Sequence, residues 1–519
     1  MPVQLCFILF LGYYDCMSQN QKIKCYFNHP VNTVISTGVN AVYLNGSFDD
    51  TVAAYINRAK YTVDIAQYDY TSTSGSIVAK IATAANNAVL RGVIVRWIYN
   101  GSSTNSGLSL LDPSINTLAS PTSSGYGIMH DKFMVIDANA ANINDPYVMT
   151  ACYDWSSTQT TGDYNNIVVL QDKPLALAYY DEFNKMWGGI GAAPNLAQSA
   201  FGTHKTPSSQ NIFNVNGTTV EIYFSPKDAT GQHLKNAINT ANDDLFFGIY
   251  TFTDTSIANL IKNKYNNGLV VRGIIDQYSK NYTTSMNTPY YILSPVLGNN
   301  LILYASGYIY HNKIMLIDAL SPSSDPQVFT GSFNWSLSAQ NSNDENAIII
   351  HDSTIANQYY QSLCQNFTDF GGLPCTAVPC PGITTLFTSS LSGTVYQWQV
   401  NTGTGFTNIV DPTNYTGMTS HDLLINNAPS SWYGYQYRCL VDGTGSDTLT
   451  LKFTCYWNGS SNTAWENPLN WNWGELPDAN TDVVINNGTP NFPVVTSNHA
   501  EVYVSAPVLQ LVLIPALLF

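Results

Sequence analysis

The segments HDKFMVID (130–137) and HNKIMLID (311–318) share one pattern: a His, a Lys two residues later, and an Asp after four apolar residues. An unbroken run of four apolar residues is typical of a buried β-strand. Because alternate residues of a strand point to the same side, the His and Lys of each segment are expected to project together. The pattern therefore predicts two buried strands, each presenting a His and a Lys from one face.

The similarity continues outward from these segments and reveals an internal duplication, in which residues 49–187 correspond to residues 230–370. Four pairs of segments carry the match: 54–71 with 236–253, 87–100 with 265–278, 124–137 with 305–318, and 148–156 with 328–336. The chain is therefore expected to contain two structurally similar repeats.

Each copy alternates helix-like and strand-like segments. SIVAKIATAANNAVLRG (76–92) precedes the apolar run VIVRWIY (93–99), and SIANLIKNKYNNG (256–268) precedes LVVRGIID (269–276). Such alternation predicts βαβ units on a mixed sheet that is covered by helices. We therefore expect an α/β fold with two repeats in a pseudo-twofold arrangement.

The remaining segments differ in composition from the repeats. Residues 190–218, rich in Pro, Ser and Asn, are expected to link the repeats. After Gly372 the alternating segments VYQWQV (395–400) and YGYQYRCLV (433–441) predict a β-sandwich. The expected boundaries are 1–20 for a degraded leader, 21–195 and 196–375 for the repeats, 376–454 for the β-sandwich and 455–519 for an incomplete β module.

The C-terminal part also carries two resemblances. Trp398, followed by Tyr437 and Cys439, resembles the pattern of an immunoglobulin-like domain, and the segment from Cys455 resembles β modules of exported proteins from Bacteroidetes-type bacteria. One or two disulfides are expected if the protein is exported, and buried thiols are the alternative. The cysteines concerned are Cys364, Cys375, Cys380, Cys439 and Cys455.

Charge and hydropathy restrict the function classes. The chain has 20 Lys and Arg against 35 Asp and Glu, a net charge of −15, and only 11% charged residues. A protein that depends on non-specific duplex binding normally has a basic patch, and the sequence has no basic run. No segment is apolar for long enough to predict a transmembrane helix. An anionic substrate must therefore be held locally, by a few cations.

A His and a Lys on one strand face suit an anion better than a metal, since the ammonium repels a cation. Phosphodiester cleavage needs a nucleophile, an acid for the leaving oxygen and cations for the developing charge. Two His and two Lys supply all three without a metal or another cofactor. We expect the two copies to face each other, so that each contributes half of a single site.

The two segments resemble the HxKxxxxD signature of the phospholipase D superfamily, and TGSFNWS (330–336) and NDENAIII (343–350) resemble its downstream elements. The resemblance spans residues 40–375 and implies two steps through a phosphohistidine. His130 would be the nucleophile and His311 the acid and base. The matching catalytic positions are His130, Lys132, Asp137, His311, Lys313 and Asp318, and the matching substrate-binding positions are Ser332, Asn334, Ser336 and Glu345.

The resemblance also implies individual roles. Lys132 and Lys313 would bind the non-bridging oxygens of the phosphate. Ser332, Asn334 and Ser336 would add neutral donors. Glu345 would orient a catalytic His through a ring N–H. Asp137 and Asp318 would support structure or electrostatics near the site, and a strand-end turn cap is the alternative reading.

The two copies are not equivalent. Copy 1 has Ala151, Cys152, Asp154 and Asn165 where copy 2 has Gly331, Ser332, Asn334 and Glu345. An ionised Asp154 facing a phosphodiester would be repulsive. Asp154 therefore turns away, pairs with Lys132, or makes the site asymmetric.

Three functions are compatible with these observations. The leading hypothesis is a secreted or cell-surface bacterial phospholipase D that cleaves a phosphatidylcholine-like phospholipid during transient contact with a membrane surface, a single chain being sufficient for the site. The second is an endonuclease that uses the same residues, disfavoured by the shortage of Lys and Arg but helped by Tyr residues that could stack on single strands. The third is an inactive surface-binding or adhesion protein.

Overall fold

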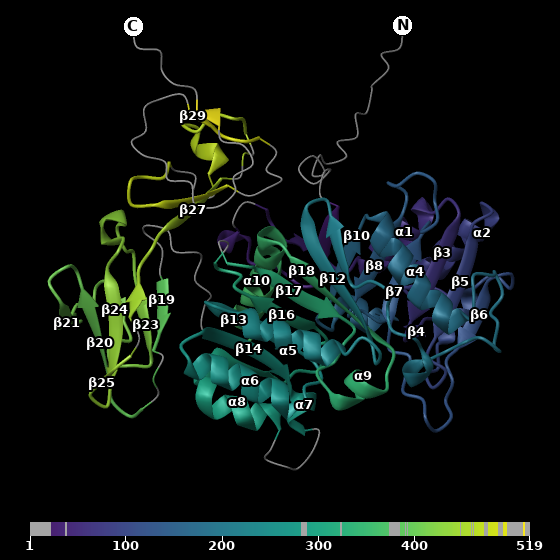
Figure 1. Ribbon diagram of the computed structural model, residues 1–519, viewed down its shortest axis with the longest axis horizontal. Helices are drawn as coiled ribbons and strands as arrows, with labels where there is room; N and C mark the ends of the chain where they lie inside the picture. The colour runs from purple at the N-terminus through teal and green to yellow at the C-terminus, as the bar shows by residue number, and fades with distance from the viewer. Residues whose placement is uncertain are drawn as a thin grey trace, which may run out of the picture.

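Two eight-stranded mixed sheets form the larger part of the molecule (Figure 1). The computed structural model describes residues 22–36, 39–281, 288–321 and 324–372, and most of 385–495 together with 512–513. The first sheet has the order β2 (Val42–Tyr43), β1 (Ile23–Phe27), β10 (Asn166–Leu170), β8 (Tyr147–Ala151), β7 (Lys132–Ile136), β3 (Thr62–Gln67), β5 (Ile94–Tyr99) and β6 (Asn116–Ala119). The second has the order β11 (Ile212–Val215), β12 (Thr218–Ser225), β18 (Glu345–His351), β17 (Gln327–Gly331), β16 (Lys313–Ile317), β13 (Asp244–Ile249), β14 (Val270–Asp276) and β15 (Leu301–Tyr304).

The two sheets correspond strand by strand from their second strand onward. In each, the strand that begins at the Lys of the His-x-Lys segment, β7 or β16, pairs antiparallel with both of its neighbours. Beyond them, β3 pairs parallel with β5 and β13 pairs parallel with β14. The predicted α/β fold with two related repeats is confirmed.

Helices cover the outer face of each sheet, and the inner faces share one core. The first sheet is covered by α1 (Phe48–Arg58) and α2 (Ala79–Leu90), and the second by α5 (Thr230–Thr240), α6 (Thr255–Asn266) and α8 (Pro289–Leu297). The shared core draws side chains from both sheets and from α4 (Lys173–Trp187) and α10 (Ser353–Asp369). This single apolar core fixes the two repeats face to face.

The closing helices α4 and α10 begin in the same way. Asp172 and Asp352 accept hydrogen bonds from the backbone N–H groups of Leu175 and Ile355, each at 2.9 Å. An Asp at this position satisfies one of the free N–H groups of the first helical turn. The duplication thus preserves the cap as well as the helix.

The predicted linker is built into the fold rather than lying free. Its Phe201 and Lys205 are buried. The ammonium of Lys205 lies 2.7 Å from Asp344 and 2.5 Å from Glu182, so it ties the second repeat to the first. A buried cation needs such partners to offset its desolvation.

The strands between residues 385 and 450 form two further sheets. They are β19 (Thr385–Thr388), β23 (Asp422–Ile425) and β22 (Tyr415–Thr416) in one, and β21 (Phe406–Asn408), β20 (Tyr396–Asn401), β24 (Gln436–Val441), β25 (Thr444–Gly445) and β26 (Leu449–Thr450) in the other. Both contribute to one core around Trp398 and Tyr437. The β-sandwich is confirmed, whereas its immunoglobulin-like kinship stays a prediction.

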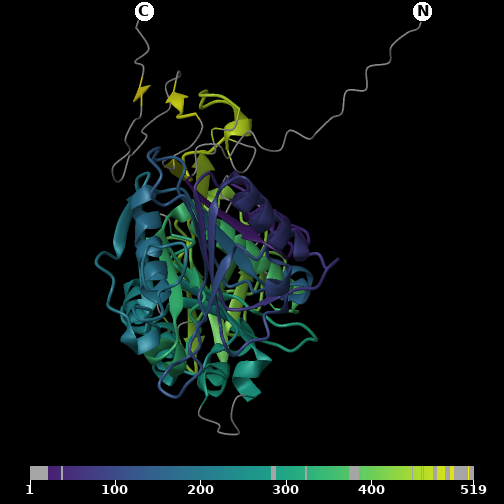
Figure 2. The same cartoon turned by 90° about the vertical axis from the view of Figure 1, so that its right-hand side faces the viewer.

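This unit lies beside the second repeat in Figure 1, and the Tyr265 hydroxyl contacts a ring nitrogen of His421 at 2.8 Å across the junction. Figure 2 shows the following segment, which contains β27 (Thr454–Trp457) and β29 (Val494–Val495), at one end of the molecule. Cys364 is in a disulfide, and Cys439 is a buried free thiol. The predicted leader lies outside the described residues.

Candidate functional site

The His-x-Lys segment of each repeat is anchored by the backbone of the other. The N–H of His130 donates to the carbonyl of Asp344 at 2.8 Å, and the N–H of Asp344 donates to Ile128 at 3.0 Å. In the equivalent place, the N–H of Tyr164 donates to the carbonyl of Ile309 at 2.9 Å. These bonds hold the start of β7 and of β16 at the junction between the repeats.

His130 is oriented by a carboxylate of the second repeat. Its Nδ1 lies 2.6 Å from Oε2 of Glu345. The same oxygen accepts a bond from the Ser332 hydroxyl at 2.9 Å, and the other oxygen accepts from the Asn343 amide at 3.2 Å. A Glu345 acceptor on Nδ1 leaves the Nε2 lone pair of His130 for chemistry.

His311 is oriented by an amide of the first repeat. Its Nδ1 lies 3.1 Å from Oδ1 of Asn165. The Asn165 amide nitrogen donates to the carbonyls of Gln159 and Asp163, so Oδ1 must face His311 as an acceptor. His311 therefore carries its proton on Nδ1 when neutral. Cys152 occupies the place that Ser332 has in the other half of the site, and its Sγ lies 3.4 Å from Oδ1 of Asn165.

The two lysines are buried, and each donates to the carbonyl of its own histidine, at 3.4 Å for Lys132 and 2.7 Å for Lys313. Lys132 also lies 3.2 Å from Oδ1 of Asp154. Each ammonium also lies near an aromatic face, at 4.6 Å from the ring centre of Tyr68 for Lys132 and 5.4 Å from that of Tyr250 for Lys313. Cation–π contact retains part of the stabilisation that burial removes from an ammonium.

Asp154 connects the two halves. Its Oδ2 lies 3.7 Å from Nε2 of His311, while its Oδ1 faces Lys132. Of the arrangements open to it from the sequence, Asp154 adopts the pairing with Lys132. One carboxylate thus contacts a lysine of the first repeat and a histidine of the second, so the two half-sites form one site.

Burial shifts the pKa of every ionisable group at the centre. Burial and then the charge of Lys132 lower the pKa of His130 well below its usual value, and burial and then Lys313 do the same for His311. Burial lowers the pKa of Lys313 to about 8 and raises that of Glu345 to about 8. Both imidazoles are therefore neutral near pH 7, as a nucleophile and a general base require.

Asp137 and Asp318 lie away from this centre. The carboxylate of Asp137 accepts bonds from the backbone N–H groups of Lys60, Tyr61 and Thr62, and that of Asp318 from Asn242, Asp243 and Asp244. Each Asp follows the far end of a strand that starts with the Lys, about 16 Å along five residues. The structure places both in the alternative role of turn cap, and their part in catalysis stays a prediction.

The predicted substrate-binding residues Ser332, Ser336 and Asn334 have different roles in the structure. The hydroxyl of Ser332 is used on Glu345, and that of Ser336 accepts from the N–H of Ala339 at 3.2 Å as the cap of α9 (Leu337–Asn341). Asn334 is half-buried, its Oδ1 has no hydrogen-bond partner among the described residues, and its amide N–H group can donate to a phosphate oxygen. Of these three side chains, Asn334 is the one left available to a phosphate.

Tyr68 and Tyr250 were not singled out from the sequence. Their rings pack against the two histidines, at 4.8 Å from His130 and 5.2 Å from His311 between ring centres. They occupy equivalent positions in the matched segments 54–71 and 236–253, and this equivalence could have identified them from the sequence.

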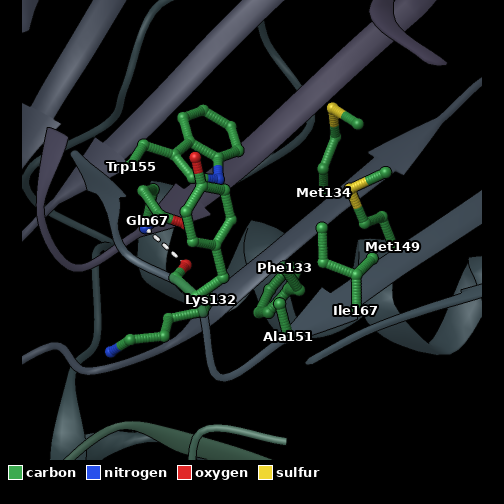
Figure 3. A pocket seen from close by; sticks show the side chains of 9 residues that line it. Gln67, Lys132, Phe133, Met134, Met149, Ala151, Trp155 and Ile167 are labelled. Carbon is green, nitrogen blue, oxygen red and sulfur yellow. Dashed lines mark hydrogen bonds between the residues drawn. The ribbon is translucent and has the colours of Figure 1, made fainter. Parts of the chain in front are cut away.

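A separate small pocket lies behind the first sheet (Figure 3). Met134, Met149 and Ile167 line it, and all three belong to the core beneath α1 and α2. In Figure 3 the Lys132 ammonium points away from these side chains. This pocket is a packing defect of the core.

Throughout the described part of the chain, no group of three or more His, Cys, Asp and Glu side chains could hold a metal ion, and no helix is long and apolar enough to cross a membrane.

Comparison with known proteins gives matches in both repeats. The family model described as cardiolipin synthase, PLD-like domain, matches residues 52–187 and 234–366. A phospholipase D of Rickettsia conorii is 26% identical over 194 residues, 36% of this chain and 87% of that protein. A mitochondrial cardiolipin hydrolase of Drosophila melanogaster is 27% identical over 152 residues, 26% of this chain and 57% of that protein. A solved phosphatidylserine synthase of Haemophilus influenzae aligns over 63% of this chain and 86% of that chain, at 14% identity and a TM-score of 0.45, which is too remote to inform function.

Proposed function

The chain belongs to the PLD-like domain family, and on this premise we propose that it hydrolyses a phosphatidylcholine-like phospholipid to phosphatidate and a free head-group alcohol. The observation that carries the proposal is the convergence of two His and Lys pairs at one junction, tied together by Glu345, Asn165 and Asp154. Relatives named phospholipase D and cardiolipin hydrolase support a lipid phosphodiester as the substrate.

In the first step, Nε2 of His130 attacks phosphorus, and the bond from phosphorus to the head-group oxygen breaks. His311, neutral in the free site, takes up a proton as the anionic substrate binds and donates it to that oxygen, so the head group leaves as a neutral alcohol. Lys132 and Lys313 bind the non-bridging oxygens and stabilise the charge that develops there. The product of this step is a phosphatidyl group on His130.

In the second step, His311 removes a proton from a water molecule that attacks the same phosphorus. The bond from phosphorus to His130 breaks, phosphatidate leaves, and His311 gives up the proton that it took from water once the site is empty. Glu345 supports His130 as the nucleophile because a carboxylate on Nδ1 stabilises the positive charge that the ring acquires when Nε2 is bonded to phosphorus.

A lipid substrate fits the charge of this chain better than a nucleic acid does. With 20 Lys and Arg against 35 Asp and Glu, the surface offers few contacts for a polyanionic backbone. A phospholipid needs one phosphate site and an apolar surface for its chains. We place the protein outside the bacterial cell or on its surface, where it meets lipid during brief contact with a membrane.

Two assays run in parallel test the proposal. Choline release from phosphatidylcholine vesicles is measured beside cleavage of a labelled single-stranded oligonucleotide, each with and without EDTA. Choline release that survives EDTA and disappears in His130→Ala supports the proposal. Cleavage of the oligonucleotide alone would replace it with an endonuclease, and turnover of neither substrate would favour a surface-binding protein.

A further inference from the structure

Asp154 is a buried carboxylate for which the two-step mechanism has no task. It is 7% exposed, and its oxygens face Lys132 at 3.2 Å and Nε2 of His311 at 3.7 Å. It therefore stands beside the lysine and the histidine that must meet the substrate phosphate. An ionised carboxylate in that place competes with the phosphate for Lys132.

The backbone around Asp154 prevents the side chain from swinging away. Its neighbours Tyr153 and Trp155 are both buried. The N–H of Trp155 donates to the carbonyl of Asp69 at 3.0 Å, and the Tyr153 hydroxyl bonds Thr160 at 2.5 Å. Moving Asp154 out of the site would unseat two large aromatic side chains from the core, which is costly.

Lys132 already has a charged partner before any substrate enters. With both imidazoles neutral, its ammonium is matched by the carboxylate of Asp154. A phosphodiester brings one further negative charge into this buried place. A buried charge without a partner is strongly disfavoured, so the site must gain a proton as the substrate binds.

The second repeat contains the uncharged equivalent of this group. Asn334 replaces Asp154 on the same framework, since the N–H of Trp335 donates to the carbonyl of Thr251 at 3.0 Å as Trp155 does to Asp69. An amide offers a donor to a phosphate oxygen and adds no charge. A protonated Asp154 would offer the same: one O–H donor and no charge.

We propose that Asp154 binds the substrate phosphate as a neutral carboxylic acid, so that each phosphodiester enters the site together with one proton. The inference rests on the proposed phosphate site and adds to it a binding residue and a coupling to pH. The position of Asp154 also lets its O–H face either a phosphate oxygen or Nε2 of His311.

The surroundings of Asp154 favour this proton. Burial raises the pKa of Asp154, and nearby Lys132 and His130 oppose that rise. Asp69 raises it further and Lys313 lowers it. The other ionisable groups that face Asp154 are His311, Tyr153, Cys152 and Asp163.

Glu345 is the competing site for the proton, because burial raises its pKa to about 8. Its oxygens are already occupied by Ser332, Asn343 and His130, so a proton on Glu345 would not offer a donor to the phosphate. Neither oxygen of Asp154 accepts a hydrogen bond within the described residues, and its one close cation is the Lys132 that the phosphate needs. We therefore assign the proton to Asp154.

Binding of methanesulfonate to the full chain tests the inference without turnover. Methanesulfonate is a tetrahedral anion with a single negative charge, like a phosphodiester, and does not titrate between about pH 5 and 7.5. Calorimetry in two buffers of different ionisation enthalpy counts the protons taken up. The wild type should take up about one proton per methanesulfonate and bind more weakly as pH rises. Asp154→Asn should take up none, keep one affinity across this range, and bind about tenfold more tightly at pH 7.5.

Glu345→Gln is the matched variant, since it removes the other carboxylate of the site. Proton uptake retained in Glu345→Gln and lost in Asp154→Asn supports the assignment. Uptake lost in Glu345→Gln and retained in Asp154→Asn overturns it, as does a wild type that binds methanesulfonate without a proton. If methanesulfonate binding is proton-coupled while neither lipid nor oligonucleotide is cleaved, the proposed function fails and the role of Asp154 stands.

Discussion

The Nδ1 atom of His130, in the first repeat, lies 2.6 Å from the carboxylate of Glu345, in the second. Neither repeat alone therefore contains an oriented nucleophile. Glu345→Gln keeps the size of the side chain but removes the charge that stabilises the ring once Nε2 is bonded to phosphorus. We expect kcat for choline release to fall by roughly 100-fold or more, with KM changed little.

Glu221→Gln is the control for this variant. Glu221 also pairs with a histidine, His351, at 2.9 Å, but at the margin of the second sheet and away from the junction. Its substitution should leave kcat unchanged. Equal losses in the two variants would mean that Glu345 acts through general stability and not on His130.

Sequence reasoning reached the His and Lys pairs because the duplication displays them twice in register. It also identified Asp154 and Asn165 as positions at which the two copies differ, since the second copy has another residue at each equivalent position. It did not reveal that Asn165 bonds His311 and that Glu345 bonds His130, both across the repeats. Pairing between repeats depends on how two sheets pack, which strand periodicity does not encode.

The same limit explains Asp137 and Ser336. A residue that matches a motif can serve the chemistry or the backbone that carries it, and a sequence shows only the match. In the structure, Asp137 adopts a left-handed conformation at φ 53°, with its carboxylate on three backbone N–H groups. Asp and Asn tolerate that conformation better than most residues.

That position gives a prediction about stability. Asp137→Asn keeps the backbone conformation but cannot accept all three bonds, so we expect a loss of about 1–2 kcal/mol in the free energy of unfolding. The kcat of the folded enzyme should stay within about twofold of the wild type. Chemical denaturation and choline release, measured on the same preparation, separate the two effects. A large fall in kcat at unchanged stability would restore a catalytic role to Asp137.

The pKa of Lys313 predicts an alkaline limit to activity. Burial lowers this pKa from its usual value to about 8, so the ammonium is charged below that pH and loses its charge above it. Because a neutral amine binds phosphate poorly, kcat/KM should fall by a further factor of about ten per pH unit above pH 8, beyond the decline that the proton uptake by Asp154 produces. In Lys313→Arg the side chain stays charged across this range, and this further decline should disappear.

Asp154→Asn serves as the companion measurement for this limit. It removes the proposed proton uptake at lower pH and leaves Lys313 in place, so the decline above pH 8 should persist in it. A decline that disappears in Asp154→Asn and persists in Lys313→Arg would assign the alkaline limit to Asp154.

The order of the two histidines in the reaction can be settled with an activated substrate. A phosphatidyl ester of p-nitrophenol has a leaving group that needs no proton, so His311→Ala should complete the first step and stop before the second, for lack of a base to activate water. We expect a burst of one equivalent of p-nitrophenol and a phosphatidyl adduct on the peptide that contains His130, detected by mass spectrometry after rapid quenching. His130→Ala should give neither. A burst in His130→Ala with the adduct on His311 would reverse the assignment, and the interaction of Glu345 with His130 would then serve the general acid instead of the nucleophile.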